Sequence, residues 1–252
     1  MKTTDSVIAI FITWGLASSA IALPAKVLQP GSVKSPLIAL DPGHSGHDIK
    51  SVDRATGLID HDYPNHPEME ECFRIAKAVQ AKLAQKGYRV VCTKEAVADS
   101  VSLHQRAKLA QEAQAALGIS IHDDHSKKFS TFAQVYAQNV GLWRGRTVEK
   151  PKAVFSDGPI AARSRIWAQI FAAERTRAEG HKVEVTSISF NGRHGIEPGN
   201  IPQVALYAGS GAHPVPWIYN EVGGIGLGPE EEAKYVQGLV NSIEKCVPIL
   251  TK

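Results

Sequence analysis

The sequence has few cysteines, and they lie far apart. Its 252 residues include three, Cys72, Cys92 and Cys246. This spacing excludes a zinc finger, and an odd number leaves at least one thiol outside any internal disulfide. If a disulfide forms, we expect Cys72–Cys92, because both should lie at one edge of the fold and Cys246 at the other. Three buried thiols are the alternative.

The sequence also lacks a large excess of charge, internal repeats and low-complexity tracts. A formal net charge of +3 is too small to indicate nucleic-acid binding and only mildly favours an acidic polymer as partner. Hydrophobic residues make up 43% of the chain and charged residues 21%, which is typical of a globular protein. We expect a monomer with one large domain or two small ones.

Long apolar runs are missing after the N-terminus. Val7 to Ala17 is apolar, follows Lys2 and is too short to span a bilayer comfortably. The small residues Ala20 and Ala22 then fit a cleavage site, so residues 1–22 are predicted to be a secretory signal peptide. An uncleaved anchor or a buried first helix is the alternative. We expect an exported protein, periplasmic or secreted, whose mature form does not span a membrane, with a leader over 23–35 and one domain over 36–252.

The remaining chain alternates between strand and helix patterns. Strands are predicted at 37–40, 88–92, 118–122, 182–188, 201–207 and 216–221. Helices are predicted from Pro67 to before Gly87, over 103–116, from about Asp157 to Arg177 with Ile166 on the apolar face, and from Pro229. This order predicts an α/β fold, a mostly parallel twisted sheet with helices on both faces in a single domain.

Two segments show no clear periodicity. Residues 47–66 are predicted to be a polar loop whose histidines and acids are mostly solvated. Residues 123–157 are longer than a typical connection, and we expect them to hold an extra strand, a lid or a substrate-facing segment that borders a cleft.

Three residues should meet at the carboxyl edge of the sheet. His44 follows the first strand in Asp-Pro-Gly-His-Ser-Gly, and His122 ends the third. Glu68 lies four residues before Cys72, in line with the buried helix face, whereas Glu70 lies on a charged stripe and Glu71 at the boundary. The alternatives are a hydrogen-bonded loop for His44 and complementation of the helix dipole for Glu68.

Two imidazoles and one carboxylate form the ligand set of a catalytic zinc site with an open fourth position. His44, Glu68 and His122 are therefore predicted to bind one Zn²⁺ ion. Glu221 ends the last strand beside a glycine-rich loop, and a carboxylate there that does not bind metal can act as general base.

These motifs resemble the zinc-dependent N-acetylmuramoyl-L-alanine amidases of the Amidase_3 type. Asp41-Pro-Gly-His44-Ser-Gly resembles the first zinc motif of the family, and Glu68 with Ile75-Ala76 resembles the second. Arg106-Ala107 with Ser120-Ile-His122 resembles the third motif, and Glu221-Val-Gly resembles the stretch that carries the catalytic glutamate. The resemblance covers about residues 36–243. It implies cleavage of the amide between the lactyl group of N-acetylmuramic acid and L-alanine, on peptidoglycan or its muropeptide fragments. Whether a protein activator is a further partner stays open.

The chain departs from the family after two of these motifs. Asp123-Asp124 follows His122 where the family usually has Ala-Asn, and Gly223-Gly224-Ile-Gly follows Glu221 in place of the usual residues. The segment between His44 and Glu68 is longer than usual. Two other functions stay open: a zinc peptidase acting on stem peptides, and a catalytically inactive wall-binding protein on the same fold.

Overall fold

The computed structural model of the chain describes residues 35–52, 59–123, 130–133, 142–143, 146–147, 158–187, 204, 207–209 and 211–249. The predicted signal peptide and nearly all of the predicted leader lie outside these residues and stay predictions. None of the helices in the described part of the chain combines the length and apolar character that crossing a membrane requires.

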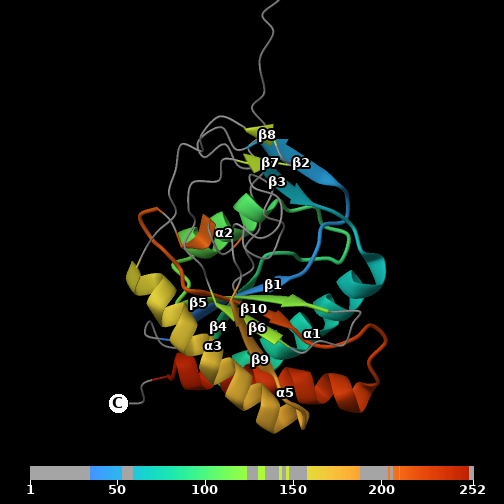
Figure 1. Cartoon of the computed structure of the whole chain (residues 1–252). Helices are drawn as coiled ribbons and strands as arrows, with labels where there is room; N and C mark the ends of the chain where they lie inside the picture. The colour runs from blue at the N-terminus through green and yellow to red at the C-terminus, as the bar shows by residue number, and fades with distance from the viewer. Residues whose placement is uncertain are drawn as a thin grey trace, which may run out of the picture.

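A six-stranded sheet forms the centre of the molecule (Figure 1). Its order is β4 (Arg89–Cys92), β1 (Leu37–Pro42), β5 (Leu117–His122), β10 (Trp217–Glu221), β6 (Ser130–Ala133) and β9 (Glu184–Ser187). The first four strands run parallel to one another, β6 is antiparallel to β10, and β9 is parallel to β6. The prediction of a mostly parallel sheet is confirmed.

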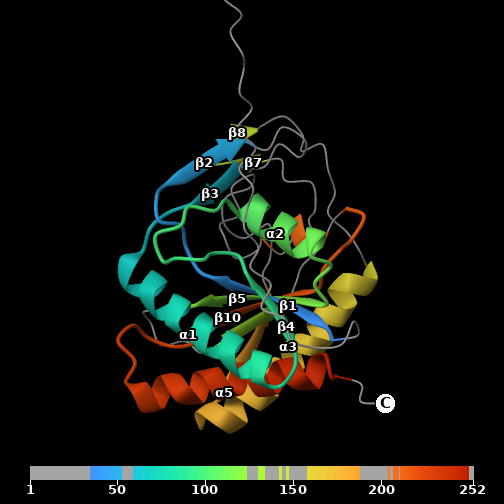
Figure 2. The same cartoon turned by 180° about the vertical axis from the view of Figure 1, so that it is seen from behind.

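Helices cover both faces of this sheet. The helices α1 (His66–Gln85), α3 (Gly158–Glu179) and α5 (Pro229–Cys246) lie on one face, and α2 (Leu103–Glu112) lies on the other (Figures 1 and 2). Successive side chains of a strand point to opposite faces. Ile38 and Leu40 therefore pack in the core under α1, α3 and α5, whereas Leu37 and Ala39 pack in the core under α2.

Local sequence signals set the helix ends. Ser102 caps α2 in a capping box with Gln105, which satisfies amide groups that the first turn leaves unpaired. Proline stands in the first turn of both α1 and α5, where its missing N–H costs nothing. Gly87 follows α1 with φ of 90°, a conformation that favours glycine.

The prediction of a solvated loop over 47–66 is wrong. The segment contains an antiparallel hairpin of β2 (Ile49–Val52) and β3 (Ile59–Asp62). Asp60 and Asp62 are buried. Asp60 accepts hydrogen bonds from the backbone amides of Leu103 and His104, at 3.3 and 3.1 Å, so it holds the hairpin against the start of α2.

Further predictions are corrected in the second half of the chain. The range 201–207 was predicted as a strand, but its described residues Val204 and Tyr207 are helical and pack in the core under α2. Ile166 is 59% exposed on α3 and does not belong to the apolar face.

The segment 123–157 is described in part. It contributes an extra strand, β6, to the central sheet, and a short antiparallel pair, β7 (Leu142–Trp143) and β8 (Arg146–Thr147). Its other residues after Asp123 lie outside the described ones, so a lid that borders the cleft stays a prediction. The three cysteines are free, Cys72 and Cys92 buried and Cys246 partly exposed. The Cys72–Cys92 disulfide is absent.

Candidate metal centre

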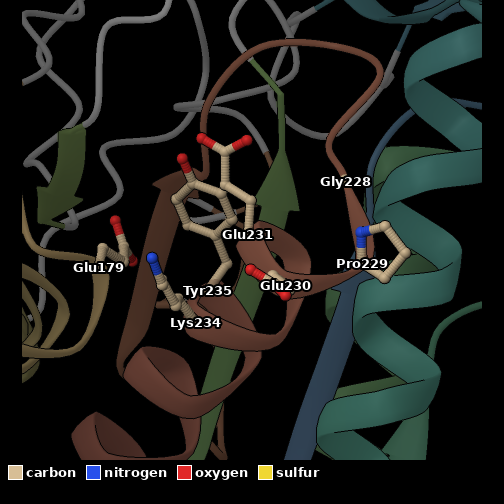
Figure 3. A pocket seen from close by; sticks show the side chains of 7 residues that line it. All are labelled: Glu179, Gly228, Pro229, Glu230, Glu231, Lys234 and Tyr235. Atoms are coloured by element: carbon tan, nitrogen blue, oxygen red, sulfur yellow. The ribbon is translucent and has the colours of Figure 1, made fainter.

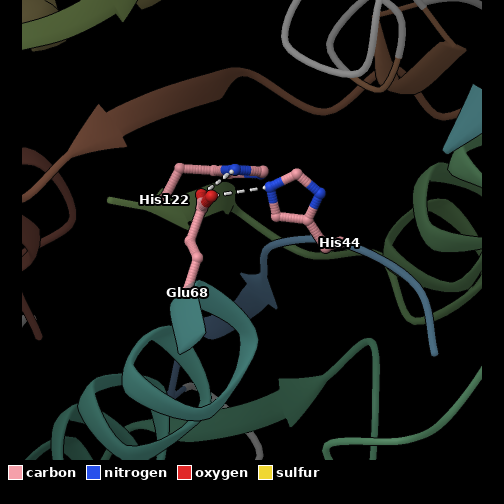
Figure 4. Close-up of side chains that lie close together, drawn as sticks. All are labelled: His44, Glu68 and His122. Carbon is pink, nitrogen blue, oxygen red and sulfur yellow. Dashed lines mark hydrogen bonds and ion pairs between the residues drawn. The ribbon is translucent and has the colours of Figure 1, made fainter. Parts of the chain in front are cut away.

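Three elements bring His44, Glu68 and His122 together. His44 follows β1, Glu68 lies in the first turn of α1, and His122 is the last residue of β5. Each offers a ligand atom, and the three atoms lie within 4.8 Å of one another (Figure 4). All three side chains are buried. This is a candidate metal-binding group at the carboxyl edge of the sheet.

Helix register separates the neighbouring glutamates. Oε2 of Glu68 lies 2.9 Å from Nε2 of His44, and Oε1 lies 2.9 Å from Nδ1 of His122. Glu70 is exposed. Glu71 was predicted at the boundary but is buried, and its carboxylate accepts hydrogen bonds from the amides of Gly226 and Leu227, each at 2.8 Å. Glu71 therefore holds the loop that follows Glu221.

The protonation states of the group suit a metal ion. Burial by itself raises the pKa of Glu68, but hydrogen bonds with His122 and His44 outweigh it, so the pKa lies below its usual value. Burial lowers the pKa of His122, although Glu68 opposes this shift. Metal ligation requires an ionised carboxylate and a neutral imidazole. The residues present therefore fit a divalent metal such as zinc.

Hydrogen bonds orient His44 towards the group. Its Nδ1 lies 3.0 Å from the backbone carbonyl oxygen of Tyr63. A carbonyl oxygen only accepts, so Nδ1 is the donor in this hydrogen bond, and Nε2 is the ring nitrogen that would bind a metal ion. Figure 4 shows Nε2 directed at Glu68 and the other ring nitrogen directed away from it. A hydrogen bond of this kind fixes the tautomer and ring orientation of a ligating histidine.

His44 has an unusual backbone conformation, and hydrogen bonds to its carbonyl oxygen stabilise it. Its φ is 61°, in the left-handed region that few side chains adopt. Its carbonyl oxygen accepts hydrogen bonds from Nζ of Lys94 at 2.8 Å and from Nη2 of Arg106 at 2.5 Å. At Gly43, a Cβ atom would lie 2.6 Å from the ring of His122. The backbone therefore approaches the ring of His122 so closely that position 43 requires glycine.

Arg106 contacts several groups around His44, and none of these contacts was predicted from the sequence. Its guanidinium is buried and pairs with Asp41 at 3.1 Å and with Asp62 at 2.8 Å. Burial lowers the pKa of Arg106, but the two carboxylates outweigh this and raise it. The sequence Ile59-Asp60-His61-Asp62 does not alternate between apolar and polar residues, so it gave no signal for a strand with buried acids.

Glu221 lies at the end of β10, directly opposite His122 on β5. Its carboxylate shares a hydrogen bond with Tyr219, whose ring stacks on that of His122 with centroids 4.6 Å apart. Its carbonyl oxygen accepts a hydrogen bond from Nη2 of Arg175 at 2.8 Å. Burial and the charges of Glu221 and Glu68 raise the pKa of Tyr219. The end of β10 thus lies beside the metal-binding group.

Asp123 is a further acidic residue next to His122. In the sequence it stood out only because the family usually has alanine at this position. It is 3% exposed, and neither carboxylate oxygen has a hydrogen-bond donor among the described residues. Burial, followed by the neighbouring Glu71, raises the pKa of Asp123 to about 8. The wall of the site next to His122 is therefore acidic and desolvated.

A pocket of about 690 Å³ lies at the start of α5 (Figure 3). It is lined by Glu179, Gly228, Pro229, Glu230, Glu231, Lys234 and Tyr235. None of the proposed site residues lines it. Its rim is connected to β10, because Glu179 pairs with Arg175 at 2.6 Å and Arg175 binds the carbonyl of Glu221.

Comparisons with known proteins agree with this fold. In fold the chain is similar to the N-acetylmuramyl-L-alanine amidase Ami1 from Mycobacterium smegmatis, with 17% identity, a TM-score of 0.56, and coverage of 86% of this chain and 99% of that one. It is also similar to the catalytic domain of CwlV, an N-acetylmuramoyl-L-alanine amidase from Bacillus (Paenibacillus) polymyxa var. colistinus, with 16% identity, a TM-score of 0.52, and coverage of 85% and 99%.

A third similar structure is the CwlD amidase from Clostridioides difficile in complex with the GerS lipoprotein. Its identity is 13%, its TM-score 0.50, and the coverage 86% of this chain and 100% of that one. No curated protein sequence matches the chain. The sequence profile of the N-acetylmuramoyl-L-alanine amidase family matches residues 38–214. The chain therefore belongs to the N-acetylmuramoyl-L-alanine amidase family.

Proposed function

We propose that this amidase is zinc-dependent, with His44, Glu68 and His122 holding one Zn²⁺ ion. The observation that carries the proposal is the convergence of their ligand atoms within 4.8 Å at the carboxyl edge of the sheet. The bond cleaved is the amide between the lactyl group of N-acetylmuramic acid and the L-alanine of the stem peptide. A zinc ion held by these residues would supply Lewis-acid chemistry, because it would polarise the amide carbonyl and lower the pKa of water to about 7.

Glu221 acts as the general base in this proposal. Its carboxylate takes a proton from the attacking water and later delivers it to the amine of the departing L-alanine. Its place opposite His122 supports the role, because the proton must be collected next to the reacting carbonyl. The hydrogen bond between its side chain and Tyr219, whose ring stacks on that of His122, also supports this role.

The substrate is peptidoglycan or a muropeptide fragment of it. Because the family acts on the cell wall, we propose that the protein is exported, periplasmic or secreted, with residues 1–22 as its signal peptide. The complex of the similar CwlD amidase with the GerS lipoprotein supports a protein as an additional partner, and we propose that this partner is an activator. We propose that the mature chain is a monomer.

Digestion of purified peptidoglycan tests the proposal. The expected products are stem peptides with a free N-terminal L-alanine and glycan strands that keep intact lactyl groups, both identified by mass spectrometry. Removing the metal with a chelator should abolish the reaction, and zinc should restore it. Shortened stem peptides would instead indicate a peptidase. Binding to the wall without any product would indicate an inactive protein.

A further inference from the structure

Tyr63 is an exposed aromatic residue next to the metal-binding group. Its side chain is 50% exposed, while its ring centroid lies 5.2 Å from that of His44. The large hydrophobic side chains exposed in the described part of the chain are Tyr63, Ile166 and Val185, and Tyr63 alone among these three is aromatic. An exposed aromatic face costs solvation free energy, and at the edge of an active site it commonly contacts a ligand.

The backbone of Tyr63 is fixed relative to His44. Its carbonyl oxygen accepts the hydrogen bond from Nδ1 of His44 at 3.0 Å, and its amide donates to Asp62 at 3.0 Å. Asp62 is itself fully buried and paired with Arg106 at 2.8 Å. The backbone that carries the ring is therefore fixed next to the metal-binding group, as a binding surface requires.

Polar groups suited to hydroxyls lie beside the ring. The ring of His61 lies 5.9 Å from that of Tyr63, and its Nε2 lies 3.1 Å from Oδ1 of Asp48. The His61 side chain is 27% exposed and that of Asp48 is 70% exposed. An aromatic face flanked by an exposed histidine–aspartate pair combines apolar contact with hydrogen bonding.

We propose that Tyr63 forms a subsite for a pyranose ring of the glycan strand, with His61 and Asp48 binding its polar substituents. A pyranose presents a broad face of C–H groups, which carry partial positive charge and stack on the negative face of an aromatic ring. On the other side of the scissile bond, alanine offers only a methyl group. The proposal rests on the proposed amidase function, because the glycan is the substrate of that reaction.

Kinetics with paired substrates test the subsite. One substrate is a disaccharide muropeptide, and the other carries the same peptide on a free D-lactoyl group without sugar. Tyr63→Ala should raise KM for the muropeptide about fivefold, since stacking contributes of the order of 1 kcal/mol. Its kcat should stay within about twofold, and KM for the lactoyl peptide should not change.

Two control variants accompany Tyr63→Ala. Tyr63→Phe keeps the aromatic face and should retain most of the affinity. Ile166→Ala removes an exposed apolar side chain of α3 and should leave both substrates unaffected. The subsite is refuted if Tyr63→Ala leaves KM unchanged for both the muropeptide and the lactoyl peptide, or raises both KM values by the same factor.

A binding measurement separates this proposal from the proposed function. Saturation-transfer NMR with the peptide-free disaccharide should show contact between the protein and the sugar C–H protons, lost in Tyr63→Ala. A wild-type protein that binds the sugar through Tyr63 but hydrolyses neither substrate would refute the amidase function alone. Hydrolysis by the wild type with sugar binding that is unchanged in Tyr63→Ala would refute the subsite alone.

Discussion

Arg106 and Asp62 form a buried ion pair, with Nη2 of Arg106 2.8 Å from Oδ2 of Asp62. The pair joins the β2–β3 hairpin to α2 next to His44, whose carbonyl oxygen accepts a hydrogen bond from the same guanidinium. Both side chains are shielded from water, at 1% and 0% exposure. A buried pair of this kind is a weak source of net stability, but losing Asp62 leaves the buried guanidinium with Asp41 alone of its two paired carboxylates.

Asp62→Ala should therefore destabilise the protein by about 3 kcal/mol, the lower end of the range for breaking a buried ion pair, because Asp41 still compensates part of the charge of Arg106. Urea unfolding followed by circular dichroism measures the change. Glu232→Ala is the matched control, because it removes the partner of Arg74 from an ion pair with a half-exposed arginine, and it should cost less than about 1 kcal/mol. Equal losses in the two variants would contradict the role assigned to the Arg106–Asp62 pair.

Glu68→Gln should weaken zinc binding by more than about 100-fold, since even residues that only support a ligand contribute 10–100-fold. Glu70→Gln, in the same turn of α1 but exposed, should bind zinc as the wild type does. Competition with a chromophoric chelator provides both affinities. Zinc binding that depends on Glu70 would refute the helix register used to choose Glu68.

Glu221→Gln keeps the shape of the side chain but cannot accept a proton. We expect hydrolysis of peptidoglycan to slow by about 10²–10⁴-fold while zinc content and folding are retained. The comparison requires wild type and variant at equal zinc occupancy. A variant that turns over at nearly the wild-type rate would show that another residue is the base.

The cysteines should react slowly in the folded protein. Burial raises the pKa of Cys92 to about 11 and that of Cys246 to about 12, and it also raises the pKa of Cys72. At pH 8 almost no reactive thiolate is present in the native state. Mass spectrometry should show little modification by iodoacetamide until urea is added, and then three modified thiols. Rapid native labelling of Cys92 would contradict its burial.

Local patterns in the sequence determined much of the fold. The apolar runs that form β1, β5 and β10 predicted the parallel sheet, and the position of Cys72 four residues after Glu68 predicted the face of α1 that packs on it. Because parallel strands share a carboxyl edge, these elements also predicted that His44, Glu68 and His122 would meet. Helix geometry alone separated Glu68 from Glu70.

Tertiary structure decided what the surroundings of each residue are. Asp60, Asp62 and Glu71 are polar in sequence and were expected at the surface or its boundary, yet they are buried because backbone amides and Arg106, from distant segments, satisfy them. Likewise Val204 and Tyr207 have strand-forming side chains but adopt helix, because packing against α2 outweighs intrinsic preference. Composition and periodicity report the average environment of a residue. Only the folded chain shows which donor or cation reaches it.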